Sequence, residues 1–487
     1  MIPPALRTWC RNHQLTVVSL VAWLTTRLYL LSAAAGVDND PTYYFTSLRD
    51  AADGWQTLRE YPVAAVGLMR GLNFLAGADL ATFRILFLLV NLACDLAFVW
   101  LLLRQPSPWR HLAVWVWIVG VACLGGFIMY RFDLIPATLA AGAVLLLVGR
   151  DAAGARRSAA AGALLALAIS LKLWPAALVP VLWAAARRRL PFLAGLTASL
   201  AILTTWAVAV AGGERFLSAL TNQGERGLQI ESVWATPVQL LRYFDPGAAW
   251  AEWEFGAIHL HGTLVGPMLA LSTAATALGG AYILALAWQL ARRRPPATAA
   301  LASLVTVLIV VASSAVFSAQ FVIWALPLAS LALVVAGPDD CPAGGVRQCL
   351  AARRNYLLGA GGLVVLAWFT GWLYPVVYDD FLAFGPTPIQ ARGLLVLLVR
   401  NVLFAGLTGY LAVLTWRQVA AEPQPSANIG DTGPGPGAAG VEPTAVAPAA
   451  AGAEAGAVPE ADDGAAGGAG DGVSRGAPAA GRPTTLR

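Results

Sequence analysis

The sequence has little charge for its length. Only 12% of its 487 residues are Asp, Glu, Lys or Arg, whereas a soluble domain carries about a quarter. Hydrophobic residues make up 58% of the chain, and apolar runs of about 20 residues recur from residue 14 to residue 416 with charges at their ends. The ten-residue alternating segments of a β-barrel are missing. These features predict an all-α, polytopic integral membrane protein.

The sequence also lacks a recognisable metal site. Its five cysteines show neither the spacing of metal ligands nor that of a disulfide framework. His259 and His261 are close in sequence, but neither a third histidine nor a nearby carboxylate is evident, so we interpret them as loop residues. We therefore predict no metal and no cofactor. The first apolar run is too long for the core of a signal peptide, so we also expect no cleavable signal.

Arginines indicate the orientation. They recur in clusters at regular intervals, and the positive-inside rule places these clusters in the cytoplasm, which predicts about twelve membrane crossings with both termini inside. The clusters are Arg7/Arg11, Arg104/Arg110, Arg150/Arg156/Arg157, Arg187–Arg189, Arg292–Arg294, Arg347/Arg353/Arg354 and Arg417. The segments that we expect on the outer face are 36–80, 130–133, 170–175, 213–262, 317–321 and 374–391.

Two stretches depart from the pattern of full-length crossings. Residues 158–186 lie between two cytoplasmic clusters and must turn back, yet each arm has only about 12 residues, too few to cross a ~30 Å core. They predict broken or re-entrant helices that line a cavity. From about residue 421 the chain is rich in Ala, Gly and Pro. We therefore predict a membrane domain at 1–420 and a disordered cytoplasmic tail at 421–487.

Ionisable residues in apolar segments are functional candidates, because they are costly in a bilayer. Arg131 and Asp133 lie at the outer end of one hairpin, and Lys172 at the outer turn of the next. Lys172 is the only lysine among 32 basic residues, which indicates a compact point charge for a phosphate. Asp133 either pairs with Arg131 or Lys172 or acts as a second acid or base; we favour pairing. Deeper in the membrane, Arg27 and Asp95 predict an ion pair.

Further polar residues are expected on the same outer face. Ser318 and Gln320 lie at an outer turn, followed by Trp324, which by itself is typical of an interfacial tryptophan. Glu231 lies in the long loop 213–262. The predicted topology brings these residues together with Asp38, Asp40, Arg131, Asp133 and Lys172. Opposite charges that converge beside broken helices indicate a binding or catalytic site.

At this point the sequence resembles glycosyltransferase family 87. The segment "DNDPTYYFTSLRDAADGWQTLREYP" is similar to the first outer loop of that family, which has an Asp–x–x–x–Tyr pattern and then an acidic or aromatic residue before Tyr-Pro-Pro. Here Glu60-Tyr61-Pro62 is followed by Val63, so the second proline is missing. "RFDLIPATLAAGAVLLL", "AGALLALAISLKLWPAALVPVLW" and "VFSAQFVIWALPL" are also similar to family segments, in order, between about residues 15 and 416.

The resemblance implies a GT-C fold and a polytopic enzyme that moves mannose or arabinofuranose from a polyprenyl-phosphate sugar to an envelope glycolipid or glycan. A single carboxylate base predicts an inverting displacement, and the charge pattern predicts that it takes place at the outer face of the plasma membrane. The bias toward arginine, alanine and glycine indicates an actinobacterial origin. The family pattern favours Asp40 as the base, with Asp38 as the alternative. Lys172 and Arg131 would bind the donor phosphate. Substrate-binding or orienting roles fall to Asp133, Tyr44, Glu60, Tyr61, Glu231, Ser318 and Gln320.

Two other functions compete with the transferase. A secondary transporter or lipid flippase also uses broken helices and intramembrane charges, but places its site near the midplane and often shows repeated halves. Here the polar residues gather at one face and no internal repeat is evident. A structural membrane subunit would explain neither the single lysine nor the convergence of charges.

Overall fold

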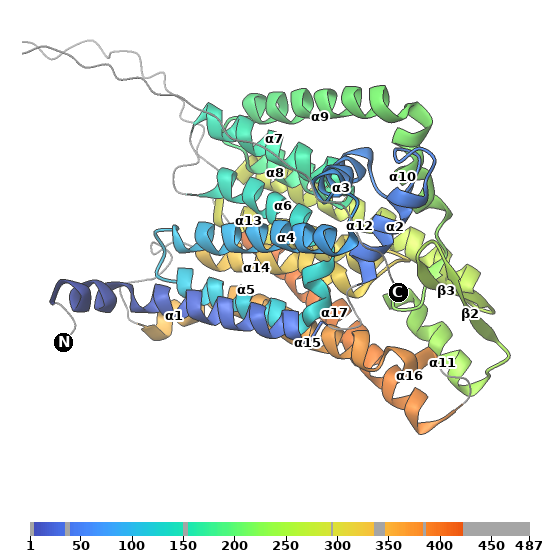
Figure 1. The fold of residues 1–487 in the computed structure, drawn as a ribbon. Helices are drawn as coiled ribbons and strands as arrows, with labels where there is room; N and C mark the ends of the chain where they lie inside the picture. Colours follow the sequence, from blue (N-terminus) through green and yellow to red (C-terminus); the bar gives the residue numbers. More distant parts are fainter. Residues whose placement is uncertain are drawn as a thin grey trace, which may run out of the picture. The chain divides into compact units, whose positions relative to one another are not determined.

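The computed structural model describes residues 4–34, 39–149, 154–293, 296–335, 346–382 and 386–421. Within these ranges the chain forms seventeen α-helices and three short strands (Figure 1). The helices are α1 (Pro4–Ser32), α2 (Asn39–Asp50), α3 (Val63–Leu75), α4 (Leu80–Leu103), α5 (Arg110–Leu124), α6 (Leu134–Val148), α7 (Ala155–Leu171), α8 (Val179–Ala185), α9 (Arg189–Ala211), α10 (Gly213–Glu225), α11 (Thr236–Phe244), α12 (Val265–Arg293), α13 (Pro296–Ser313), α14 (Val322–Val335), α15 (Val346–Gly371), α16 (Tyr378–Leu382) and α17 (Pro388–Ala421).

Shorter elements connect the helices. Four 3-10 helices are η1 (Gly126–Tyr130), η2 (Trp174–Leu178), η3 (Val233–Ala235) and η4 (Ala319–Phe321), and a π-helical turn occupies Trp372–Val376. The strands are β1 (Leu228–Gln229), β2 (Ala249–Glu254) and β3 (Ala257–Gly262), which form an antiparallel sheet in the order β1-β3-β2. The predicted tail lies outside the described residues, apart from Ala421.

Six helices are long and apolar enough to span a bilayer, which confirms the prediction of an all-α polytopic membrane protein. These spans are His13–Ser32, Leu80–Leu103, Arg189–Ala211, Val265–Arg293, Arg353–Val376 and Pro388–Ala421. Shorter apolar helices of 10–17 residues lie among them. Helices α6 and α14 bury almost every side chain, as expected of inner helices that are apolar all round. The figure of about twelve crossings and the orientation remain predictions.

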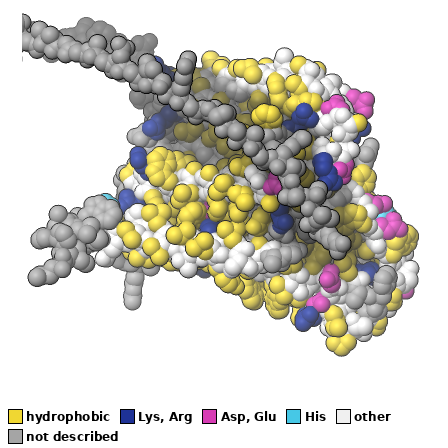
Figure 2. All heavy atoms as spheres, viewed as in Figure 1, with side chains coloured by type: hydrophobic (Ala, Val, Ile, Leu, Met, Phe, Trp, Pro, Cys, Tyr) yellow, Lys and Arg dark blue, Asp and Glu magenta, His cyan; other side chains and the backbone are white. Residues whose placement is uncertain are grey.

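Charged side chains are distributed unevenly over the molecule. On the face in Figure 2, hydrophobic side chains cover the helices, and the visible acidic side chains gather toward the end that carries α10, β2 and β3. We call the end formed by α2, α10, α11 and the three strands the loop end.

Helices α7 and α9 pack very closely. A Cβ atom added to Gly162 would collide with the carbonyl oxygen of Phe192, and one added to Gly195 would collide with that of Ala159. Small residues permit this approach between helices in membranes, where packing rather than the hydrophobic effect drives association.

The segment 158–186 differs in part from its prediction. Its first arm lies within α7, a continuous helix of 17 residues that already begins at Ala155. The return arm is broken into η2 and α8, with Pro175 and Pro180 near their starts. The chain turns at Lys172, whose extended backbone ends α7. The return arm is therefore broken as predicted, whereas the first arm is one continuous helix; re-entry of either arm stays a prediction.

Helices α1, α4 and α5 are joined by the predicted ion pair. Asp95 accepts hydrogen bonds from Arg27 Nε at 2.6 Å and Nη2 at 3.1 Å. It also accepts from the indole nitrogens of Trp23 at 2.8 Å and Trp117 at 2.6 Å. Arg27 is 1% exposed and Asp95 is fully buried. The structure confirms the Arg27–Asp95 pair and adds two donors from tryptophan that no sequence pattern indicated.

Candidate active site

Asp40 and Arg131 form the first of two ion pairs at the loop end. Asp40 lies in the first turn of α2, where a carboxylate is favoured by the helix dipole. Arg131 follows η1 directly, and its Nη1 lies 2.5 Å from Asp40 Oδ1. The two side chains are 20% and 18% exposed, so both remain accessible to a ligand. Asp38, the alternative base, lies outside the described residues.

Lys172 and Asp133 form the second ion pair. Lys172 caps the C-terminus of α7 and Asp133 the N-terminus of α6, and each charge has the sign that its helix end favours. Lys172 Nζ lies 2.7 Å from Asp133 Oδ1, which also accepts a hydrogen bond from Trp324 Nε1 at 2.6 Å. Asp133 is thus paired with Lys172, one of its two predicted partners.

Aromatic rings surround the Lys172 ammonium. The Nζ atom lies 5.6 Å from the ring centre of Tyr61, 5.8 Å from that of Trp324 and 6.0 Å from that of Phe321, all within range of a cation–π interaction. Trp324 also stacks on Trp174 at 5.0 Å. The interpretation of Trp324 as an interfacial residue is wrong: it is 5% exposed and helps to position Asp133.

Two tyrosines connect the pairs. Tyr44 donates to Asp40 Oδ2 at 3.1 Å, and the Tyr44 and Tyr61 hydroxyls lie 2.8 Å apart. Burial, aided by Asp40, raises the pKa of both phenols well above the usual value, so both are neutral. Since Tyr44 uses its one proton on Asp40, Tyr61 donates to Tyr44. The chain of contacts therefore runs from Asp40 through both phenols to the ring that faces Lys172.

Arg131 is held in place by residues on three other elements. Asn91 in α4 donates to the carbonyl oxygens of Met129 at 2.9 Å and Arg131 at 3.3 Å. Arg131 Nη2 donates to the Tyr374 hydroxyl at 3.3 Å, and its guanidinium lies 5.8 Å from the ring centre of Phe127. Tyr374 was missed by the sequence analysis because only the folded chain brings it to Arg131.

Arg215 in α10 fixes the loop that carries Tyr61. Its guanidinium donates to the carbonyl oxygens of Trp55, Thr57, Leu58 and Tyr61 at 2.9 to 3.1 Å. The side chain is only 1% exposed. A single planar cation therefore satisfies four main-chain acceptors and ties the loop after α2 to α10. Arg215 had no distinguishing signal in the sequence, where it is one of several polar residues in a long loop.

Glu231 lies buried after β1. Its main-chain oxygen accepts hydrogen bonds from Arg400 at 2.6 Å and from Asn401 at 3.4 Å, both on α17. The carboxylate Oε2 lies 3.9 Å from Arg400 Nη2. Burial raises the pKa of Glu231 to about 7, while Arg400 and Arg131 oppose the rise.

The remaining predicted residues have contacts of their own. Ser318, just before η4, accepts a hydrogen bond from Gln229 Nε2 at 2.7 Å. Gln320 lies within η4, next to Phe321, and is partly exposed. Glu60 is also partly exposed and accepts from Tyr43 at 2.8 Å, on the exposed side of α2. The hydrogen bonds of Ser318 and Glu60 thus join them to Gln229 and Tyr43.

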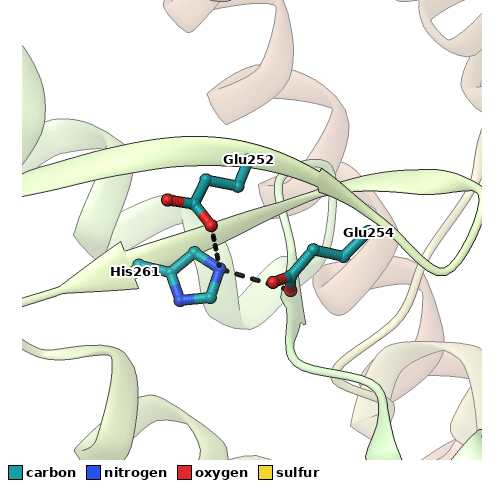
Figure 3. A group of neighbouring side chains, drawn as sticks. All are labelled: Glu252, Glu254 and His261. Atoms are coloured by element: carbon teal, nitrogen blue, oxygen red, sulfur yellow. Dashed lines mark ion pairs between the residues drawn. The ribbon is translucent and has the colours of Figure 1, made fainter.

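The structure corrects the interpretation of the two histidines. They lie on strand β3, not in a loop, and His259 is fully buried. His261 has two carboxylates nearby: its Nε2 lies 3.3 Å from Glu254 and 3.8 Å from Glu252 (Figure 3). Pairing of β2 with β3 brings these carboxylates to the histidine, which spacing along the chain did not reveal.

Comparison with known families decides the class. The model of glycosyltransferase family 87 matches residues 60–314, more than half of the chain. The chain belongs to glycosyltransferase family 87. A search of curated proteins finds no significant match. The matched segment contains Arg131, Asp133, Lys172 and Glu231 but begins after Asp40.

Membership of this family, together with the apolar helices, makes the protein a membrane glycosyltransferase. It sets aside the transporter, the flippase and the structural subunit as primary functions. The family match confirms the resemblance over residues 60–314, a shorter stretch than the sequence motifs suggested.

Proposed function

We propose that this glycosyltransferase moves a hexose or pentose, with mannose favoured, from a polyprenyl-phosphate sugar to a cell-envelope glycolipid or glycan. The reaction would take place at the outer face of the plasma membrane, to which the arginine pattern assigns the loop end. The observation that carries the proposal is the joining of two ion pairs, Asp40–Arg131 and Asp133–Lys172, through Tyr44 and Tyr61. A membrane-anchored phosphosugar needs this combination of cations and a carboxylate base.

The proposed step is a single inverting displacement. An acceptor hydroxyl oxygen attacks the anomeric carbon of the donor while the bond from that carbon to the phosphate oxygen breaks. The hydroxyl proton passes to Asp40, because a free alcohol is a poor nucleophile near neutral pH. The polyprenyl phosphate leaves with the bonding electrons, and Lys172 and Arg131 stabilise its negative charge.

The Asp40–Arg131 contact supports an order of binding. In the structure, Arg131 Nη1 donates a hydrogen bond to Asp40 Oδ1. A donor phosphate offers the guanidinium a second anion that it can bind through two parallel hydrogen bonds. Transfer of Nη1 from Asp40 to the phosphate would leave Oδ1 free for the acceptor hydroxyl, while Tyr44 still holds Oδ2. Donor binding would therefore precede acceptor binding.

Lys172 is suited to the phosphate because its ammonium has three donors on a compact head. One donor engages Asp133, and the aromatic rings around it offer no competing acceptor of comparable strength. Asp133 would keep the ammonium in position, and Trp324 would keep Asp133 in position. Glu231, Ser318, Gln320 and Glu60 would contact sugar or acceptor hydroxyls around this centre.

The experiment is a transfer assay with purified protein in lipid nanodiscs. The donors are radiolabelled polyprenyl-phosphomannose and its arabinofuranose analogue, and the acceptor is a lipid extract of the cell envelope. We expect label in a new glycolipid with one donor. Asp40→Asn should lower kcat by about 10²–10⁴-fold. Lys172→Met should raise the donor KM and lower kcat, because a cation for the leaving phosphate is lost.

Asp50→Asn is the matched control for the base. Asp50 lies in the same helix but is 63% exposed and is paired with its neighbour Arg49. The Asp50→Asn variant should therefore have the activity of the wild type. Full activity of Asp40→Asn would move the base to Asp38 or Asp133. Failure of the wild type to transfer label from either donor would overturn the donor class.

A further inference from the structure

Strands β2 and β3 form a tight hairpin at the loop end. The two turn residues, Phe255 and Gly256, have φ values of +49° and +70°, as in the hairpin turns whose twist matches that of the strands. The register pairs Trp250 with His261. Because side chains alternate between faces, Trp250, Glu252 and Glu254 project from the same face as His261.

Three ligand atoms converge on that face (Figure 3). His261 Nε2 lies 3.3 Å from Glu254 Oε2 and 3.8 Å from Glu252 Oε2, and the three atoms lie within 4.8 Å of one another. Ligands about 2.0–2.2 Å from a tetrahedral zinc ion are about 3.3–3.6 Å apart. The Nε2–Glu254 contact already has this spacing, and a small rotation of Glu252 brings the other close to it.

The histidine nitrogen needs a positive partner. His261 Nε2 is shielded from solvent and forms no hydrogen bond, although two carboxylate oxygens face it. An imidazole lone pair directed at two carboxylates is repulsive unless a cation lies between them. A proton on Nε2 would favour a hydrogen bond to one oxygen, whereas the observed arrangement has one nitrogen and two oxygens around a common point.

Trp250 supplies the outer support that metal ligands usually have. Its indole Nε1 donates to Glu252 Oε1 at 2.8 Å, which leaves Oε2 directed toward His261. Its ring also stacks on the His261 imidazole, with 5.8 Å between centres and 21° between planes. Residues that hydrogen-bond a ligating carboxylate or fix a ligating ring orient the ligands and raise affinity. The contacts of Trp250 thus orient two of the three groups.

We propose that Glu252, Glu254 and His261 bind one divalent transition metal ion, with zinc the best fit. One imidazole nitrogen and two carboxylate oxygens form a mixed ligand set that suits zinc, and three protein ligands leave a fourth position for water. Calcium and magnesium prefer oxygen ligands in larger number. The three side chains are 33% to 52% exposed, so the group lies near the protein surface. This site is separate from the Asp40 and Lys172 pairs and does not rest on the proposed reaction.

The test is a zinc titration of the full-length protein, purified without a polyhistidine tag and stripped with EDTA. Calorimetry gives the affinity and elemental analysis gives the metal content. We expect one zinc per chain. Glu254→Gln and His261→Ala should each weaken binding by more than about 100-fold, and Trp250→Phe by about 10–100-fold as the outer support is lost.

His111→Ala is the control, because His111 on α5 has an unpartnered Nδ1 atom but no place in the group; its zinc affinity should equal that of the wild type. Absence of zinc binding by the wild type at millimolar concentration would overturn the proposal. Equal affinities in the wild type and His261→Ala would also overturn it, as would tighter binding of calcium or magnesium than of zinc.

Discussion

Asp95→Asn tests how strongly one buried ion pair joins α1, α4 and α5. The substitution keeps the shape of the side chain but removes its charge. Arg27, only 1% exposed, then lies in the interior without a counter-ion. Four donors also lose a charged acceptor, namely two on Arg27 and one each on Trp23 and Trp117.

The expected loss follows from these contacts. Removing one partner of a buried pair costs about 3–5 kcal/mol, because an uncompensated charge stays buried. The asparagine oxygen still accepts some of the four hydrogen bonds, so we expect a loss near the lower limit, about 3 kcal/mol. This is a large share of a typical stability of about 5–15 kcal/mol. Replacing both partners, as in Arg27→Met with Asp95→Leu, should restore most of the lost stability, because no charge remains to be desolvated.

Unfolding can be followed in detergent micelles by tryptophan fluorescence during denaturant titration. The exposed pair Arg49–Asp50, with side chains 58% and 63% exposed, provides the control, since surface ion pairs contribute little. Asp50→Asn should leave the midpoint unchanged. The reasoning fails if Asp95→Asn unfolds at the wild-type midpoint, or if the double variant loses as much stability as the two single variants together.

Three further predictions concern the loop end. Burial raises the pKa of Glu231 from an ordinary 4.5 to about 7. Between these two pH values the folded state therefore binds more protons than the unfolded state. The unfolding free energy should fall as pH rises from about 4.5 to 7. The fall should be about 3 kcal/mol; an equal fall in Glu231→Gln, measured by unfolding titrations across this range, would contradict it. Arg215→Lys should increase proteolytic cleavage in residues 51–62, since one ammonium cannot satisfy four carbonyl oxygens; limited proteolysis at the wild-type rate would argue against the clamp. Trp324→Phe keeps an aromatic ring, although a smaller one, and removes the donor to Asp133; it should lower transfer activity about 10-fold. Unchanged kcat and donor KM would remove Trp324 from the site.

The sequence alone was sufficient for the class of the protein, and it also gave several residues of the candidate site. Apolar runs with charged ends determine membrane helices, because the length and polarity of a span are local properties. Lys172, Arg131 and Asp133 could be identified as candidates because a single lysine and charges at helix ends are also local features of the sequence. Arg27 and Asp95 could be paired because an ionisable residue in a bilayer needs a partner at its own depth.

The tertiary structure decided which groups meet. Asp133 pairs with Lys172 rather than with Arg131, which pairs with Asp40, 91 residues away in the chain. Trp324 could not be distinguished from an interfacial residue until packing showed that it is buried against Asp133. Contacts between residues this far apart depend on how helices pack, and periodicity in the sequence does not contain that information.

The contrast between what the sequence determines and what the tertiary structure decides is clearest at the loop end. From the sequence, Arg215 was one polar residue among several, and His261 was a loop histidine without ligands near it. The fold places Arg215 under four carbonyl oxygens and His261 beside Glu252 and Glu254. Composition and charge thus determined that this chain is a membrane protein and indicated candidate polar residues toward one end. The register of the β2–β3 hairpin and the packing of long loops, which fix side chains in three dimensions, decided which of these side chains meet.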